Sequence, residues 1–184
     1  MKLIIVDMDG TLFDTKDVNF HAYRQALEEY GFALDYDYFC QFCNGKHYSQ
    51  FLPQFTTNDK HILSAIHSRK KELYPQFIER ARLNSGLVDI LHALRGNYRT
   101  ALVTTASRTN CEEILNHFQL TPLFDLILTQ EDIAHPKPHP EGFSRAMAYF
   151  SASAQETIIF EDSDVGLEAA KQTGATYYQT YGFA

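Results

Sequence analysis

The sequence predicts a doubly wound α/β protein, in which helices cover both faces of a parallel sheet and a helical segment is inserted after the first strand. Three observations support this fold class. Short apolar runs alternate with amphipathic segments of helical period. The connections between these runs and segments are short, as in sheets with crossover helices. One long segment near the N-terminus contains helical patterns and no convincing strand.

Five apolar runs are expected to form the parallel strands. Residues 3–6 read Leu-Ile-Ile-Val, a continuous run typical of a strand that is buried on both faces. The other runs are residues 100–103, 124–128, 157–160 and 175–178, of which the last is the weakest. Helical spacing of apolar side chains predicts helices between them, over residues 87–94, 111–118, 143–150 and 165–170.

The segment 16–83 interrupts this alternation and is expected to form a separate helical cap domain. Its helical patterns cover residues 18–30, 36–42 and 59–80, with a short one near Tyr48. Glycines and a proline separate them, which is typical of connections between helices. Residues 1–15 and 84–184 would then form the α/β core domain.

Composition excludes several classes of function. The 184 residues carry a net charge of -7 without a basic block, which argues against binding to nucleic acid or to an anionic membrane. No apolar run approaches the roughly 20 residues that a transmembrane helix needs. The chain contains 3 cysteines, of which Cys40 and Cys43 form a C-x-x-C pair. We interpret them as core or surface thiols of a protein from a reducing compartment, the cytoplasm, with a metal or redox pair as the alternative.

Acidic side chains follow two of the predicted strands. Asp7 and Asp9 come after residues 3–6, and Glu161 and Asp162 come after residues 157–160. Because the carboxyl ends of parallel strands meet at one edge of the sheet, these acids are expected to converge there. Carboxylates gathered in a buried crevice repel each other unless a cation is present, and Mg²⁺ prefers such oxygen ligands. A polar turn and a helix cap remain the simpler alternatives for each pair alone.

Groups suited to an anion follow two further segments. Thr104 and Thr105 come after residues 100–103 and precede a predicted helix, where hydroxyls and backbone N–H groups bind anions. Lys137 lies between prolines in the loop 136–140. His135 and His139 flank this lysine and are expected to be ordinary loop histidines. Together with the acids, these groups favour a phosphoryl group bound beside Mg²⁺.

These residues make the chain resemble the haloacid dehalogenase-like (HAD) superfamily, in the branch of β-phosphoglucomutase and phosphoglycolate phosphatase. The resemblance covers the whole chain, and its motifs occur in order. They are Asp7-Met8-Asp9-Gly10-Thr11, Val103-Thr104-Thr105, Lys137-Pro138 and Glu161-Asp162-Ser163, the last followed by Gly166, Ala169, Ala170 and Gly174. The resemblance implies a Rossmann-like core with the strand order 5-4-1-2-3, numbered along the chain, and an inserted helical cap.

The resemblance also implies a Mg²⁺-dependent phosphatase that hydrolyses a small phosphorylated metabolite. Asp7 would attack phosphorus and carry an aspartyl-phosphate, while Asp9 would protonate the leaving oxygen and then deprotonate water. Protonation of the Asp9 carboxylate at pH 7 costs about 4 kcal/mol. We expect a neighbouring negative charge and closure of the cap to offset this cost. The metal ligands would be the Asp7 carboxylate, the Asp9 carbonyl and Asp162, with Glu161 adjacent or direct, and the phosphate ligands would be Thr104, Thr105 and Lys137.

Two alternatives follow from the same residues. β-Phosphoglucomutases carry a phosphate-binding arginine in the cap, where this chain reads Gly45-Lys46-His47-Tyr48 with Tyr48 in its place, and Asn19 replaces a histidine. Because tyrosine cannot make a bidentate phosphate contact, a phosphatase is favoured over a mutase. Gly45 and Lys46 remain candidate substrate-binding residues. A non-catalytic binding protein is disfavoured because every motif residue is intact, and a monomer or weak dimer is expected.

Overall fold

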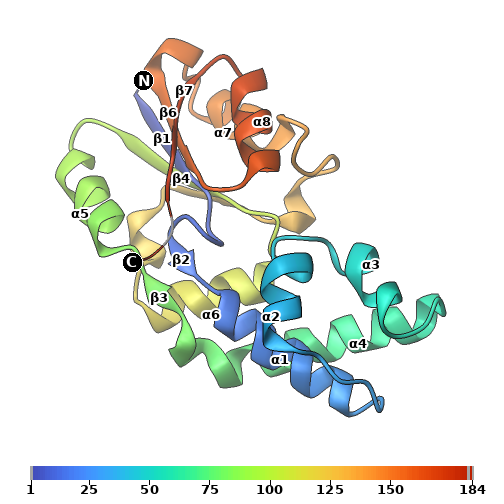
Figure 1. Cartoon of the computed structure of the whole chain (residues 1–184). Coiled ribbons are helices and arrows are strands. Elements are labelled where there is room, and N and C mark those ends of the chain that lie inside the picture. Colours follow the sequence, from blue (N-terminus) through green and yellow to red (C-terminus); the bar gives the residue numbers. More distant parts are fainter. Residues whose placement is uncertain (1, 182, 184) are drawn as a thin grey trace. The chain divides into compact units, whose positions relative to one another are not determined.

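The computed structural model describes residues 2–181 and 183 of the chain, shown in Figure 1. The chain divides into two compact units. One contains Met1–Asp14 and Arg82–Ala184, and the other contains Thr15–Ala81. The first unit is α/β and the second is helical.

A five-stranded parallel sheet forms the centre of the α/β unit (Figure 1). Its strands are β1 (Leu3–Val6), β4 (Arg99–Val103), β5 (Leu126–Leu128), β6 (Thr157–Glu161) and β7 (Thr176–Gln179), in the order β5-β4-β1-β6-β7. Read from β7, this is the predicted order 5-4-1-2-3. The continuous apolar run of β1 occupies the middle, where Ile5 pairs with Ala101 on one side and Ile159 on the other.

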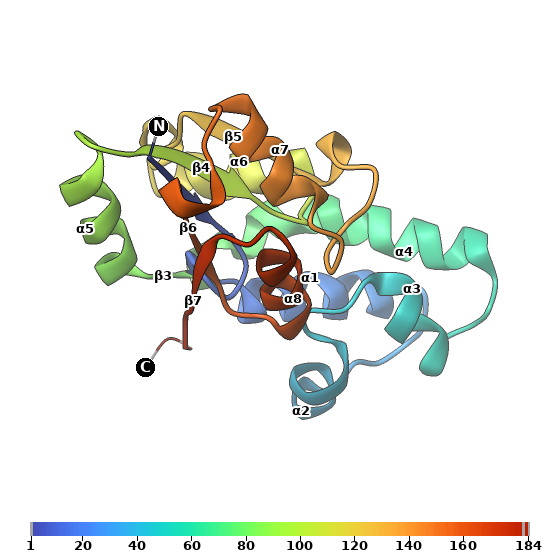
Figure 2. The same ribbon diagram turned by 90° about the horizontal axis from the view of Figure 1, so that it is seen from above.

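Helices connect these strands (Figure 2). They are α5 (Ser85–Leu94), α6 (Arg108–His117), α7 (Glu141–Tyr149) and α8 (Asp164–Gln172). Phe143 of α7 and Ala169 of α8 share one buried cluster with Leu3 and Ile5, so both helices cover the same face of the sheet. Because α6 and α8 lead the chain away from β1 in opposite directions, right-handed connections place them on opposite faces. The predicted doubly wound fold is therefore confirmed.

Two strand predictions need correction. The run 124–128 forms a strand only from Leu126, because the Asp125 carboxylate accepts a hydrogen bond from Thr100 N at 2.9 Å and pairs with Arg99 at 3.0 Å. We also expected no strand within residues 16–83. Instead, β3 (Arg82–Leu83) pairs antiparallel with β2 (Phe13–Asp14). A two-residue strand is too short to show an alternating pattern.

The helical unit has its own apolar core. It contains α1 (Lys16–Glu28), α2 (Tyr36–Tyr38), the π-helical turn η1 (Phe39–Cys43), α3 (Tyr48–Phe51), α4 (Lys60–Leu73), and the 3₁₀ segments η2 (Leu52–Gln54) and η3 (Tyr74–Arg80). The predicted helix 59–80 changes to 3₁₀ at Tyr74, because Pro75 cannot donate the next α-helical hydrogen bond. Phe20, Leu27 and Ile66 belong to the buried core of this unit.

Cys43 lies in the same core and is 1% exposed, while Cys40 is half-buried. Neither belongs to a group of metal-ligating side chains within the described residues, and neither forms a disulfide there. Cys43 therefore packs in the core of the helical unit. Among the described residues, no helix combines the length and apolar character that crossing a membrane requires.

Candidate active site

The turn after β1 carries the first acidic pair. Asp7 is buried, and its backbone N–H donates to Phe160 O at 3.0 Å, which fixes the end of β1 against β6. Asp9 lies in the same turn and is half-buried. Gly10 has a φ of +91°, and a Cβ there would lie 2.1 Å from Asp162 Oδ2. The turn therefore needs glycine both for its backbone conformation and to let the Asp162 carboxylate approach.

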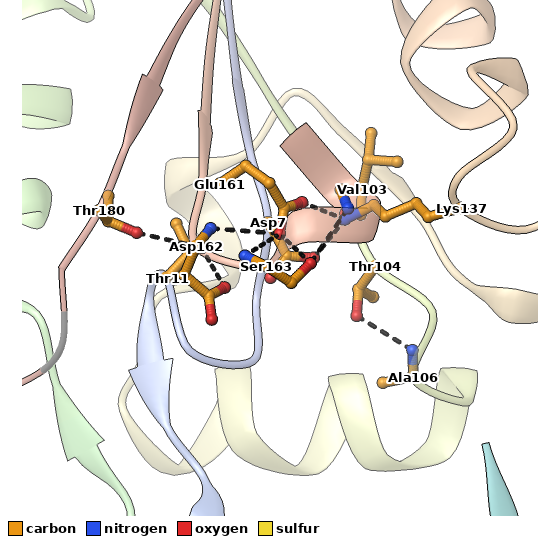
Figure 3. A network of polar contacts seen from close by, with 11 residues as sticks. Asp7, Thr11, Val103, Thr104, Ala106, Lys137, Glu161, Asp162, Ser163 and Thr180 are labelled. Carbon is orange, nitrogen blue, oxygen red and sulfur yellow. Dashed lines mark hydrogen bonds and ion pairs between the residues drawn. The ribbon is translucent and has the colours of Figure 1, made fainter. Parts of the chain in front are cut away.

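Lys137 reaches this turn from the loop before α7 (Figure 3). Its Nζ donates to Asp7 Oδ1 at 2.5 Å and to Glu161 Oε2 at 2.6 Å. A weaker contact joins Nζ to Val103 O at 3.4 Å. The side chains of Lys137, Asp7 and Glu161 are 9%, 8% and 1% exposed, so the ammonium is shared between two carboxylates away from solvent.

The other oxygen of Glu161 is held by the start of α8. Oε1 accepts hydrogen bonds from Ser163 Oγ at 2.8 Å and from the backbone N–H groups of Ser163 and Asp162 at 3.1 and 3.2 Å. Gly166 follows one turn later, and a Cβ there would lie 2.0 Å from the Glu161 carboxyl carbon. Both carboxylate oxygens of Glu161 are thus occupied by protein donors.

Asp162 is held from the opposite side. Thr11 Oγ1 donates to Asp162 Oδ1 at 2.9 Å, and Thr180 Oγ1 donates to Thr11 Oγ1 at 3.3 Å (Figure 3). Thr180 follows β7, and its backbone N–H donates to Glu161 O at 2.8 Å. The end of the last strand therefore supports the carboxylate through the Thr11 hydroxyl.

The two threonines after β4 differ in exposure. Thr104 is buried, its N–H donates to Leu128 O at 2.9 Å, and its Oγ1 accepts from Ala106 N at 3.0 Å. Thr105 is exposed. The Lys137 ammonium contacts the carbonyl of Val103, the residue before Thr104, so this turn lies beside the carboxylate cluster (Figure 3).

The site has strongly perturbed electrostatics. Burial raises the pKa of Asp7 well above its ordinary value, and the Glu161 charge raises it further, against the opposing effect of Lys137. Burial also raises the pKa of Asp162 to about 6. Burial alone would lower the pKa of Lys137, but the Asp7 and Glu161 carboxylates raise it above its ordinary value. The lysine therefore stays charged, while excess negative charge remains at the acids.

Such a cluster has the donors for a hard cation. Asp7, Glu161 and Asp162 each offer a carboxylate oxygen, and these atoms all lie within 4.8 Å of one another. The raised pKa values of Asp7 and Asp162 indicate that the protein alone does not neutralise their charge. Oxygen donors of this kind fit Mg²⁺.

The sequence-predicted residues are divided between the two units. Asp7, Thr104, Lys137, Glu161 and Asp162 gather at the carboxyl edge of the sheet, and Asp9 lies in the turn that begins with Asp7. Gly45 and Lys46 belong to the helical unit, where Gly45 has a φ of +77° and Lys46 is exposed.

The two positions that depart from β-phosphoglucomutase also lie in the helical unit. The Tyr48 ring stacks on His67, with centroids 4.1 Å apart. Asn19 Oδ1 accepts from Lys70 Nζ at 2.5 Å. Both side chains therefore take part in the packing and hydrogen bonding of this unit.

Sequence reasoning assigned no role to Thr11, Ser163 or Thr180. Thr11 and Ser163 stand inside the quoted motifs, so their positions beside Gly10 and Asp162 were the available signal. No sequence signal pointed to Thr180, because its hydrogen bond to Thr11 joins residues that are far apart along the chain.

Comparison with known proteins gives consistent matches. A family model described as haloacid dehalogenase-like hydrolase matches residues 4–179. A phosphorylated carbohydrates phosphatase of Thermotoga maritima is 26% identical over 95% of this chain and 82% of its own length. The fructose-1-phosphate phosphatase YqaB of Escherichia coli is 27% identical over 93% of this chain and 92% of its own length. The crystal structure of CbbY from Rhodobacter sphaeroides in complex with phosphate superposes with a TM-score of 0.85 at 23% identity, covering 100% of this chain and 87% of that one.

Proposed function

The chain belongs to the haloacid dehalogenase-like hydrolase family, and we propose that it is a Mg²⁺-dependent phosphatase of a small phosphorylated sugar. The family match and the phosphatase relatives support the reaction class. The names of those relatives refer to phosphorylated carbohydrates and to fructose 1-phosphate, and they are the reason for proposing a sugar.

The observation that carries the proposal is the contact of Lys137 Nζ with Asp7 Oδ1 at 2.5 Å. A buried carboxylate must approach an anionic phosphate to act as a nucleophile. The ammonium lowers the repulsion between them and holds the carboxylate in one position. Thr104 and Thr105, in the adjacent turn, would hold the phosphate oxygens.

The reaction would proceed in two displacements. An Asp7 oxygen attacks phosphorus while the ester P–O bond breaks, and Asp9 donates a proton to the leaving sugar oxygen. Water then attacks the aspartyl-phosphate, Asp9 accepts its proton, and the bond between Asp7 and phosphorus breaks to release phosphate. Asp7 and Asp9 both return to their starting states.

Mg²⁺ would be held by the Asp7 carboxylate, the Asp9 backbone carbonyl and Asp162. When bound, it neutralises charge on the nucleophile and the phosphate as they approach. We assign Glu161 to the adjacent position, since its two oxygens already accept from Lys137 and from the start of α8. There it would hold the lysine and the loop that carries Asp162.

A sugar phosphomutase is the alternative. It would need a cationic group for a second phosphate, and Tyr48, stacked on His67, cannot provide one. Lys46 is exposed and keeps this alternative testable. A non-catalytic protein of the same fold is disfavoured because Lys137 contacts the Asp7 carboxylate and the Asp162 carboxylate lies within 4.8 Å of it.

The experiment is a phosphate-release screen over phosphorylated sugars, phosphoglycolate and nucleotides, with Mg²⁺ and with chelator. We expect phosphate to be released from at least one sugar phosphate with Mg²⁺, and this release to be lost in chelator. Conversion of a hexose 1-phosphate to the 6-phosphate without free phosphate would favour the mutase. No turnover of any substrate, including p-nitrophenyl phosphate, would favour the binding protein.

A further inference from the structure

We propose that His135, His139 and Glu141 form a second cation site, selective for a transition-metal ion of the Zn²⁺ class. One ligand atom from each of these side chains lies within 4.8 Å of the other two. His135 and His139 precede α7 in the chain, and Glu141 is the first residue of that helix. None of them belongs to the Asp7 cluster.

Glu141 organises the loop around the first histidine. Its Oε1 accepts from Ala134 N at 2.9 Å, and its Oε2 accepts from His135 N at 3.0 Å. The same Oε2 lies 2.7 Å from His135 Nδ1. In a neutral imidazole, Nδ1 then carries the proton and Nε2 keeps its lone pair. Metal-binding histidines commonly have this arrangement, in which a carboxylate holds the ring nitrogen that does not bind the ion.

The second histidine is placed beside the first. The ring centroids of His135 and His139 are 4.9 Å apart, and both residues are exposed. His139 Nδ1 accepts a hydrogen bond from Glu141 N at 3.2 Å, and an ion that binds this histidine would replace that bond at Nδ1. The prolines at 136, 138 and 140 restrict the backbone between these residues, so little additional conformational entropy is lost when an ion joins the two rings.

The donor set determines the class of ion. Two imidazole nitrogens, with Glu141 as the outer carboxylate that holds His135 Nδ1, suit Zn²⁺, Ni²⁺ or Cu²⁺, whereas Mg²⁺ prefers oxygen ligands alone. The cluster of Asp7 and Asp162 is all-oxygen, with Asp7 buried and Asp162 half-buried, whereas both histidines of the other cluster are exposed. The chain therefore offers two cation sites of different chemical preference.

The site has a structural consequence for the loop. Lys137 lies between the two histidines along the chain, and its ammonium holds Asp7. An ion bound by residues 135 and 139 would fasten the backbone on both sides of this lysine. Binding is therefore expected to raise the melting temperature of the protein, because only the folded loop presents both rings together.

The test is calorimetric titration of Zn²⁺ into the full chain in a large excess of Mg²⁺, which occupies the oxygen cluster. One Zn²⁺ per chain is expected to bind. Loss of an outer carboxylate typically weakens metal binding about 10- to 100-fold, which is the expected effect of Glu141→Gln. The double variant His135→Ala, His139→Ala loses direct ligands and is expected to lose at least as much. The matched control is His61→Ala with His92→Ala, two exposed histidines outside the cluster, which should bind Zn²⁺ as the parent does.

A spectroscopic measurement makes the test independent of folding effects. Cu²⁺ bound to the parent should show nitrogen coupling from two imidazoles by electron paramagnetic resonance. Each single variant, His135→Gln or His139→Gln, should show coupling from one. Zn²⁺ affinity that is equal in the parent and the double histidine variant, or Cu²⁺ with oxygen coordination only, would overturn the proposal. The binding measurements use no substrate, so they hold whether or not the phosphatase proposal succeeds.

Discussion

Lys137 Nζ lies 2.5 Å from Asp7 Oδ1, although 130 positions separate the two residues along the chain. The same ammonium lies 2.6 Å from Glu161 Oε2, so one buried cation joins three segments of the sheet edge. Loss of the Lys137 charge is therefore expected to destabilise both the Asp7 and the Glu161 carboxylates.

Asp7→Asn is expected to abolish phosphate release while the fold is retained. The amide keeps the shape of the side chain but cannot act as the nucleophile. Phosphate release is measured with Mg²⁺ on the best substrate of the screen, and the fold is followed by circular dichroism. Turnover by this variant at a rate near that of the parent would sink the assignment of Asp7.

Asp9→Asn is expected to lower the turnover rate by about 10²- to 10⁴-fold, because it removes the proposed general acid and base. The loss should be smaller for a substrate with a good leaving group, such as p-nitrophenyl phosphate, since that group needs less protonation. Comparison of the two substrates is the measurement. An equal loss on both would argue that Asp9 acts in some other way.

Lys137→Ala is expected to lower the free energy of unfolding by about 3 to 5 kcal/mol at neutral pH, because it leaves buried carboxylates without their counter-ion. Lys171→Ala removes an exposed lysine of α8 and serves as the matched control, with a change within about 0.5 kcal/mol. Urea denaturation in chelator measures both. The loss should shrink in acid, since the raised pKa of Asp7 lets this carboxyl become neutral there. A variant as stable as the parent at neutral pH would contradict the argument.

Gly166→Ala is expected to weaken Mg²⁺ binding and turnover, although alanine is the better helix former. The new Cβ would lie 2.0 Å from the Glu161 carboxyl carbon, so the carboxylate must move. Gly86→Ala in α5 is the matched control. Its Cβ would meet only Asn84 Oδ1 at 3.7 Å, and it should be neutral or stabilising by up to about 1 kcal/mol. Equal behaviour of the two variants would show that the contact with Glu161 is unimportant.

Mg²⁺ affinity is expected to fall below pH 6. Asp162 has a pKa raised to about 6, and the metal binds only its deprotonated form. Protons and Mg²⁺ therefore compete, and the affinity should drop roughly tenfold for each pH unit below 6 from this group alone. Titration calorimetry between pH 5 and pH 8 measures the slope. An affinity that does not change over this range would exclude Asp162 as a ligand.

Thr11→Val is expected to shift the fall in Mg²⁺ affinity to higher pH. The Thr11 hydroxyl donates to Asp162 Oδ1 at 2.9 Å and lowers the pKa of that carboxyl, so its removal raises the pKa further. Thr11→Ser keeps the hydroxyl and should retain the parent profile. The pH dependence of Mg²⁺ affinity in the three proteins is the measurement, and identical profiles would rule out this role for Thr11.

Local patterns were sufficient for much of the fold. The five parallel strands, the four helices of the α/β unit and the acids at two strand ends could be predicted, because burial of a strand on both faces and polar strand ends leave direct marks in sequence. The strand order was predicted from the family resemblance alone. Element ends were less predictable. The strand β5 begins late because Asp125 binds the neighbouring strand, and η3 begins where Pro75 interrupts α-helical hydrogen bonding.

By itself, the sequence determined the fold class, the family resemblance and the residues that stand at the sheet edge. Only the tertiary structure decided that Lys137 bridges Asp7 and Glu161, and that Thr180 supports Asp162 through Thr11. Only the tertiary structure, likewise, decided that ligand atoms of His135, His139 and Glu141 lie within 4.8 Å of one another. The physical reason is that hydrogen bonds and ion pairs depend on distances of a few ångströms between side chains. The number of residues between two positions in the sequence does not give their distance in the folded chain.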